Sequence, residues 1–93
     1  MDLKEIREQI DLIDDDLVRL FIKRMNLSLQ VANYKKEHNL PIHVPAREQE
    51  ILQTISEQVD PEMSDYVCNL YTLIFKLSKD LQSKHLGIDT EVV

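Results

Sequence analysis

The feature that most constrains this chain is a long stretch near its N-terminus that contains neither glycine nor proline. It runs for about 36 residues, over positions 3–38, and apolar residues recur through it at the spacing of one helical face. Glycine and proline are the residues least tolerated inside a helix. The pattern therefore predicts a single helix over residues 3–38, with Asp2 as its N-cap.

The length of this helix limits how the chain can fold. At about 1.5 Å per residue it would be ~54 Å long. A compact globule of 93 residues has a radius of gyration of only ~12 Å. One copy of the chain cannot cover an apolar stripe of that length, so we expect a second copy to pack alongside in an intertwined helical homodimer.

Proline and glycine positions predict two further helices. Pro41 cannot continue the first helix, and Pro45 suits the first turn of a short second helix over residues 45–58. Asp60 and the proline after it are start signals for a third helix of medium length, which should run to residue 85. Gly87 is a natural C-terminal cap, and residues 87–93 are expected to fray.

Composition and charge narrow the class of protein. No segment resembles a β-hairpin, so the chain should be all-α and should form a single domain over residues 1–93. The net charge of −6 argues against nucleic acid as a partner, because such proteins need a basic face. We also expect no membrane association, since no apolar run approaches the ~20 residues that span a bilayer. The lone Cys68 suits a cytoplasmic location.

A cation lies in the middle of the predicted stripe. On a heptad grid Leu17, Arg24 and Val31 share one column, and an unpaired guanidinium in such apolar surroundings would cost several kcal/mol. Lys35 recurs on nearly the same helix face, about 16 Å further along the axis. An anion should therefore meet Arg24, either a small ligand that Lys35 also binds or a carboxylate such as Asp14 of a second chain.

Other polar side chains lie close to apolar positions of the shorter helices. Arg47 and Glu48 stand at the head of the second helix, where they could also be ordinary first-turn charges. Ser78 and Gln82 lie one turn apart on the third helix and mean little by themselves. Together these residues supply a guanidinium, a carboxylate, a hydroxyl and an amide.

Arg7 belongs to the same stripe but lies too far from the other cations to share a small ligand with them. About 25 Å of helix separates it from Arg24 of the same chain. An antiparallel partner could bring its own Arg7 to that position. Without such a ligand, Arg7 and Lys35 would extend their charges into water.

The sequence carries no motif for a metal, a cofactor or a nucleophile. His38, His43 and His85 have neither the HExxH pattern nor paired cysteines beside them, and there is no glycine-rich phosphate loop. We therefore expect no metal and no cofactor. Cations and neutral hydrogen-bonding groups alone suit the binding of a small polyanion, or a reaction that needs only confinement and electrostatic stabilisation.

Five segments carry a resemblance to a known family. They are residues 6–14, 22–25, 31–35, 45–48 and 78–82, which read IREQIDLID, IKRM, VANYK, PARE and SKDLQ. No single segment is specific, but the five in register resemble the all-helical (AroQ-class, type II) chorismate mutases. The resemblance covers residues 3–83. It implies an isomerase of aromatic amino acid biosynthesis, on the shikimate pathway, that rearranges chorismate to prephenate without a cofactor.

The same resemblance implies which residues bind the two carboxylates of chorismate. Arg24 of one chain and Arg7 of its partner would hold them, so that each active site is shared between two chains. Arg47 and Ser78 would support these contacts.

The resemblance also implies the contacts of the remaining substrate groups. Glu48 would accept a hydrogen bond from the ring hydroxyl. Lys35 and Gln82 would donate to the ether oxygen, which makes them catalytic together with Arg24. The family commonly has aspartate where this chain has Val44, and we expect that difference to alter substrate affinity rather than to abolish activity.

Two other functions fit parts of the same pattern. Isochorismate-pyruvate lyase has the same scaffold and could use the same cations, although it resembles this chain less at Glu48 and Ser78. A non-enzymatic helical dimerisation module would show a similar stripe. That module does not explain why a cation occupies the central column.

Overall fold

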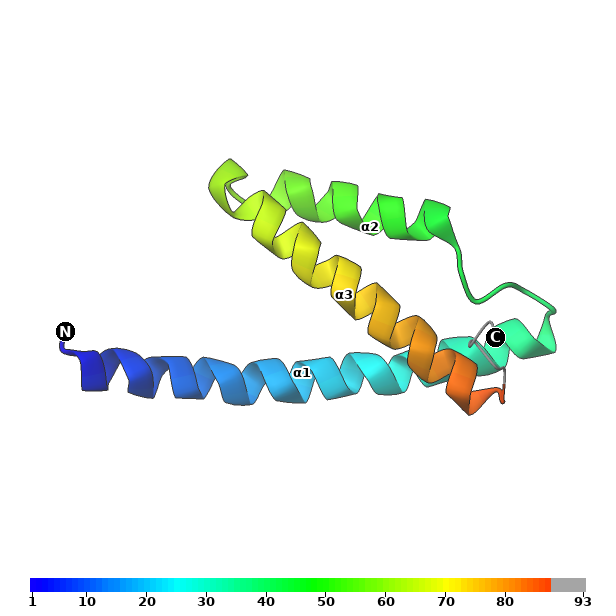
Figure 1. Ribbon diagram of the computed structural model, residues 1–93, viewed down its shortest axis with the longest axis horizontal. Coiled ribbons are helices and arrows are strands. Elements are labelled where there is room, and N and C mark those ends of the chain that lie inside the picture. Colours follow the sequence, from blue (N-terminus) through cyan, green and yellow to red (C-terminus); the bar gives the residue numbers. More distant parts are fainter. Residues whose placement is uncertain (88–93) are drawn as a thin grey trace, which may run out of the picture.

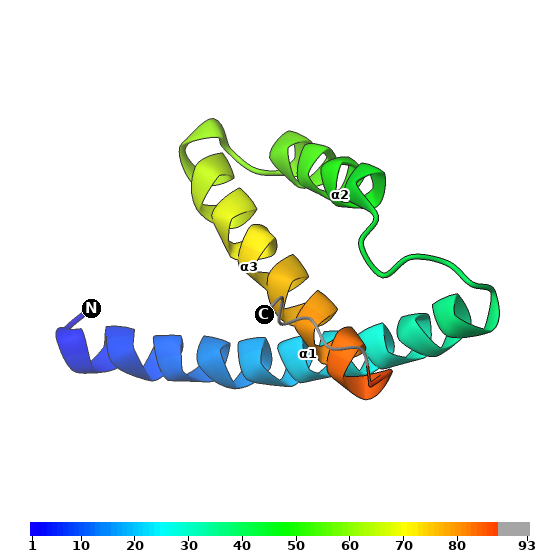
Figure 2. The same ribbon diagram turned by 45° about the vertical axis from the view of Figure 1, so that its right-hand side comes forward.

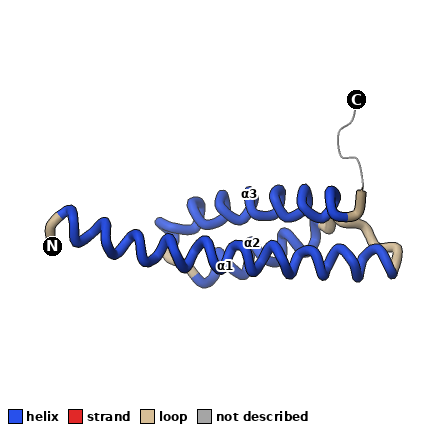
Figure 3. Tube along the Cα trace, turned by 90° about the horizontal axis from the view of Figure 1, so that it is seen from below, coloured by secondary structure: helices blue, strands red, loops and turns tan. Residues whose placement is uncertain are grey.

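The fold consists of three α-helices joined by two short loops (Figures 1 and 3). The computed structural model describes residues 1–87, and this part of the chain contains α1 (Leu3–Glu37), α2 (Pro45–Gln58), α3 (Pro61–His85) and no strand. The all-α prediction is confirmed, and each predicted helix boundary lies within one residue of the observed one. Of the segment expected to fray, only Gly87 lies inside the described residues.

Local interactions fix both ends of α1. The Asp2 carboxylate accepts a hydrogen bond from the backbone N–H of Glu5 at 2.8 Å, which is the predicted N-cap. At the other end Asn39 has a left-handed φ of 55°, a conformation that asparagine tolerates better than most residues. The chain therefore leaves the helix before it reaches Pro41.

The two ends of α3 are held mainly by the backbone. Asp60 is the N-cap residue, as expected, but its side chain makes no capping hydrogen bond. The backbone begins the helix instead. The Asp60 carbonyl accepts a hydrogen bond from the N–H of Met63 at 2.9 Å, and the following proline has the φ that the first turn requires. Gly87 has a φ of 71° and donates to the carbonyl of Lys84, as expected of a C-terminal cap.

The helix α3 holds the fold together. It packs against both α1 and α2, whereas α1 and α2 do not approach each other within residues 1–87. Figures 1 and 2 show α3 crossing the second half of α1 and running back beside α2. The buried apolar residues of the described chain are Ala32 of α1 and Phe75 of α3. The core is therefore small and lies where these two helices meet.

The first half of α1 has no other helix against it (Figures 1 and 2). The molecule is 53 Å long, and its radius of gyration of 16.5 Å exceeds the ~12 Å of a compact chain of this size. Leu17, in the centre of the stripe, is 54% exposed. As predicted, the chain leaves its own stripe uncovered; the exposed side chains are those of Leu3, Ile6, Ile10, Ile13, Leu17 and Leu20.

Candidate active site

A cavity of about 330 Å³ lies between the second half of α1, the head of α2 and the C-terminal half of α3. Its volume is that of a site for a small molecule. Seven of the eight residues that the sequence singled out line it: Arg24, Lys35, Val44, Arg47, Glu48, Ser78 and Gln82. The fold thus brings together side chains that are up to 58 positions apart in the sequence (82 − 24).

Arg7 is the residue that the chain does not bring to this cavity. It lies in the exposed first half of α1, about 25 Å of helix away from Arg24. This is the separation expected from the sequence. A contribution from Arg7 therefore requires a second copy of the chain and stays a prediction.

Arg24 is held against two aromatic rings of α3. Its guanidinium carbon lies 5.8 Å from the ring centre of Tyr71 and 5.9 Å from that of Phe75. Such cation–π contacts stabilise a cation without neutralising its charge. Within residues 1–87 Arg24 forms no ion pair, so the chain itself supplies no carboxylate for it. Pairing with Asp14 of a second chain stays open.

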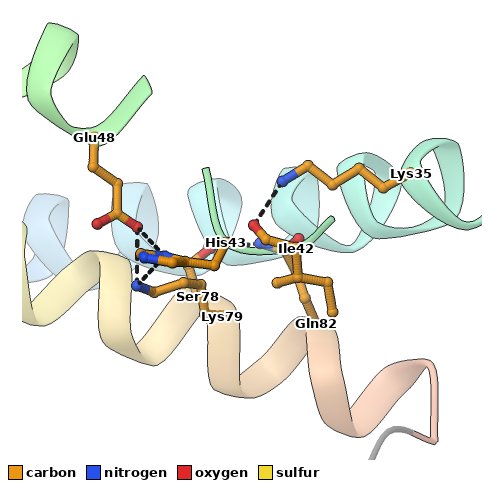
Figure 4. A network of polar contacts seen from close by, with 7 residues as sticks. All are labelled: Lys35, Ile42, His43, Glu48, Ser78, Lys79 and Gln82. Carbon is orange, nitrogen blue, oxygen red and sulfur yellow. Dashed lines mark hydrogen bonds and ion pairs between the residues drawn. The ribbon is translucent and has the colours of Figure 1, made fainter. Parts of the chain in front are cut away.

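Lys35 ties the loop before α2 to α1. Its ammonium nitrogen donates a hydrogen bond to the carbonyl oxygen of Ile42 at 2.9 Å (Figure 4). Burial lowers the pKa of Lys35 below its ordinary value, and the negative charge of Glu48 partly offsets that effect. Because an ammonium carries three donors, two N–H groups of Lys35 remain for a ligand.

A chain of hydrogen bonds runs from α3 to α1 beside the cavity. Gln82 donates through Nε2 to the Ser78 hydroxyl at 3.1 Å, and that hydroxyl donates to the oxygen of Ser28 at 2.7 Å. The Ser28 hydroxyl donates in turn to the backbone carbonyl of Arg24 at 3.1 Å. All three side chains are buried, so the orientation of each depends on the others. The amide nitrogen of Gln82 keeps a second N–H for a ligand.

The first turn of α2 contributes three of the lining residues. The Arg47 guanidinium pairs with Glu50 at 2.6 Å at the protein surface, where both side chains are more than 60% exposed. Glu48 is less exposed and pairs with Lys79 of α3 (Figure 4). Val44 is the N-cap residue of α2 and makes no side-chain capping bond.

Sequence reasoning missed three residues that support this site. Ser28 falls in the same heptad column as Lys35, so the spacing that singled out the lysine also pointed to the serine. Tyr71 and Phe75 look in the sequence like core residues of α3. Nothing in the sequence indicates that their rings would face Arg24.

The described residues contain neither a cluster of metal-binding side chains nor a helix that could span a membrane. No group of three or more His, Cys, Asp or Glu side chains in residues 1–87 is placed to hold a metal ion. None of the three helices is both long enough and apolar enough to cross a bilayer.

Comparison with known sequences shows the family. The sequence profile of the family described as chorismate mutase type II matches residues 6–83. This chain belongs to the type II chorismate mutases. It is similar to a chorismate mutase of Methanocaldococcus jannaschii, with 30% identity over 89 residues that cover 90% of this chain and 87% of that protein.

A solved structure of the same family supports the fold. The crystal structure of chorismate mutase from Helicobacter pylori in complex with prephenate matches with a TM-score of 0.83 and 35% sequence identity. The match covers 91% of this type II chorismate mutase chain and 93% of that chain.

Other relatives are much longer proteins. A bifunctional chorismate mutase/prephenate dehydratase of Aquifex aeolicus is 46% identical over 54 residues, and a T-protein of Haemophilus influenzae is 47% identical over 51 residues. The aligned parts cover 58% and 55% of this chain but only 15% and 14% of those proteins. The mutase family is thus found both in short chains and as part of larger ones.

Proposed function

We propose that this chain catalyses the rearrangement of chorismate to prephenate, in the synthesis of aromatic amino acids. The observation that carries the proposal is the cavity itself, which is lined by Arg24, Lys35 and Arg47 from two helices. A doubly negative substrate matches those cations. This reaction needs no nucleophile, only confinement of the substrate and donors for the developing charge.

The rearrangement is intramolecular, so all atoms of the substrate remain in the product. The ether carbon–oxygen bond breaks while a carbon–carbon bond forms, and negative charge grows on the ether oxygen in the transition state. Lys35 and Gln82 each keep an N–H to donate to that oxygen. Arg24 would hold a carboxylate and keep the substrate in the compact conformation that reacts. Ser78 and Arg47 would support that contact, and Glu48 would accept from the ring hydroxyl.

We propose that a second copy of the chain completes each site. The uncovered first half of α1 is apolar along one face, which suits an identical helix packed against it. Such a dimer would bury the stripe and bring the partner subunit's Arg7 to the cavity, where it would bind the second carboxylate. The three helices would then form one domain that is stable as a dimer.

We also propose that the enzyme is cytoplasmic. The support is compositional, because Cys68 is the only cysteine in the sequence and cannot form an internal disulfide. Fractionation of cells that express the chain with a C-terminal tag would test this, and recovery in a secreted fraction would contradict it.

The experiment that tests the activity separates the three functions considered for this pattern. Purified protein is mixed with chorismate and, separately, with isochorismate, and the products are identified by chromatography. We expect prephenate from chorismate. Salicylate and pyruvate from isochorismate would identify a lyase instead, and no reaction with either compound would indicate a dimerisation module.

A further inference from the structure

Lys79 of α3 forms an ion pair that differs from the others in the described chain. Its ammonium nitrogen lies 3.0 Å from Oε2 of Glu48 on α2 (Figure 4). The lysine-carboxylate and arginine-carboxylate pairs elsewhere in residues 1–87 join neighbours on one helix, at the protein surface. Lys79 and Glu48 are only 31% and 24% exposed, and their pair joins two helices at the lining of the cavity.

A histidine of the preceding loop braces the same pair. Nδ1 of His43 lies 3.0 Å from the ammonium nitrogen of Lys79 and 3.5 Å from Oε2 of Glu48 (Figure 4). An ammonium can only donate, so Lys79 donates to an unprotonated Nδ1 of His43. Lys79 is thereby fixed between two acceptors.

The charges around the cavity explain why Glu48 needs such a partner. Glu48 is the one carboxylate that lines the cavity, whereas four cations line it, namely Arg24, Lys35, Arg47 and Lys79. Val44, which also lines the cavity at the start of α2, carries no charge, so it adds no second carboxylate there. A single carboxylate among four cations could pair with any of them. A cation held in a fixed position therefore determines the orientation of the carboxylate.

We infer that Lys79 is a positioning residue, which holds Oε2 of Glu48 so that Oε1 is left to accept a hydrogen bond from a substrate hydroxyl. The ammonium of Lys79 contacts Oε2 of the carboxylate, and no ion pair or hydrogen bond of the described chain falls on Oε1. The inference rests on the proposed function, in which Glu48 binds the ring hydroxyl of chorismate. It adds a residue to which neither the sequence pattern nor the resemblance gave a role.

A double-mutant cycle tests this inference. The variants are Lys79→Met, Glu48→Gln and the double mutant, and their kcat and KM for chorismate are measured separately. Because the hydroxyl contact is present in both the ground state and the transition state, Lys79→Met should raise KM about tenfold and leave kcat within about twofold. In the Glu48→Gln background the same substitution should change KM less than about twofold.

Two further variants serve as controls, one for the charge of Lys79 and one for the loss of a lysine elsewhere on α3. Lys79→Arg keeps the cation and should restore most of the affinity that Lys79→Met loses. Lys84→Met removes a lysine of the same helix that pairs with Asp80 at the surface, at the same 3.0 Å, and should behave like the wild type. Where Lys79→Met does not fold, Lys79→Gln takes its place in the cycle.

Three results would overturn the inference. Additive effects in the cycle would mean that Lys79 binds the substrate itself. A Lys79→Met enzyme indistinguishable from Lys84→Met would mean that the pair is an ordinary solvated one. Failure of Lys79→Arg to restore affinity would mean that the cation is not what matters.

The melting temperatures of the same four proteins are also measured without substrate. This second readout does not depend on the proposed function, so the two claims can fail separately. We expect a coupling of about 3 °C between Lys79 and Glu48, the scale of a partly buried ion pair in a chain of this size. Absence of coupling would mean that Lys79 and Glu48 do not interact, and this would contradict the inference whatever the substrate is. A wild-type protein that shows the coupling but does not convert chorismate would instead overturn the proposed function.

Discussion

The two halves of α1 have the same apolar period in the sequence but very different surroundings in the structure. In the second half Ser28 and Ala32 are buried against α3, and Arg24 and Lys35 line the cavity. In the first half no helix lies against the stripe and Leu17 is 54% exposed, whereas the second half is covered in part, with Leu27 and Val31 still 50% and 46% exposed. Helical periodicity thus shows that a face is apolar, but it does not show whether the same chain or another one covers it.

The two halves of α1 also have different proposed roles. The second half lines a cavity together with α2 and α3 of the same chain. The first half would contribute its stripe, and the arginine on it, to another copy. Variants in the second half should therefore cost activity directly, and variants in the first half should cost it through assembly.

Removal of a cation from the second half should cost the most activity. Arg24→Ala and Lys35→Ala should each lower kcat for chorismate by about 10²-fold or more, the scale of losing one transition-state donor. Steady-state kinetics measures the loss, and Arg19→Ala is the matched control because Arg19 pairs with Asp16 at the surface. Losses below tenfold for both cavity variants would contradict their catalytic roles.

A charge placed on the stripe of the first half should act through assembly. Leu17→Glu would bury an unpaired carboxylate in the proposed dimer, so we expect monomers by sedimentation and at least about a tenfold loss of activity at low protein concentration. Leu12→Glu is the control, since Leu12 lies on the polar face of the same helix. Dimers that persist unchanged with Leu17→Glu would argue against a stripe interface.

The pH dependence should report the ionisation of Lys35. Gln82 does not titrate, so activity should stay level from neutral pH until Lys35 loses its proton. Burial lowers the pKa of Lys35, so this loss should come at a lower pH than for an exposed lysine. Glu48→Gln removes the charge that raises this pKa, so its alkaline limit should move to still lower pH, while Glu50→Gln should leave it in place. A sharp fall between about pH 6 and 8 in the wild type would contradict this assignment.

Replacement of Val44 should have the smallest effect on turnover. Val44→Asp would supply the missing cap of α2, worth about 1 kcal/mol, and should raise the melting temperature by about 4–8 °C. Val44→Asn would cap without adding a charge, so the comparison of the two variants isolates the effect of a second acid on KM. A large rise in kcat with Val44→Asp would mean that the natural valine severely limits turnover, which would contradict this expectation.

The helices could be predicted from the sequence because glycine and proline mark their ends. Pro41, Pro45 and Pro61 stop or start helices through steric constraints that act locally. The side chain of Asp60 could not be predicted in the same way, because a surface rotamer is decided by small differences in free energy.

Only part of the candidate site could be predicted from spacing. Helical periodicity alone placed Arg24 and Lys35 on one face of α1. The convergence of Glu48 and Gln82 with them rested on family resemblance, because it depends on how α2 and α3 pack. The pairing of Glu48 with Lys79, across two helices, left no periodic signal in the sequence.

A mixture of two inactive variants tests the central claim most directly. Arg7→Ala and Arg24→Ala chains are co-expressed with different tags, and the mixed dimers are isolated by both tags and assayed with chorismate. Each mixed dimer would have one intact site, with Arg24 from one chain and Arg7 from its partner.

An unfractionated mixture should therefore regain about a quarter of wild-type activity, because about half of its dimers are mixed and each of these has one working site of two. The isolated mixed dimers should reach about half of wild-type activity. Mixed dimers as inactive as either parent would contradict an active site shared between two copies of the chain.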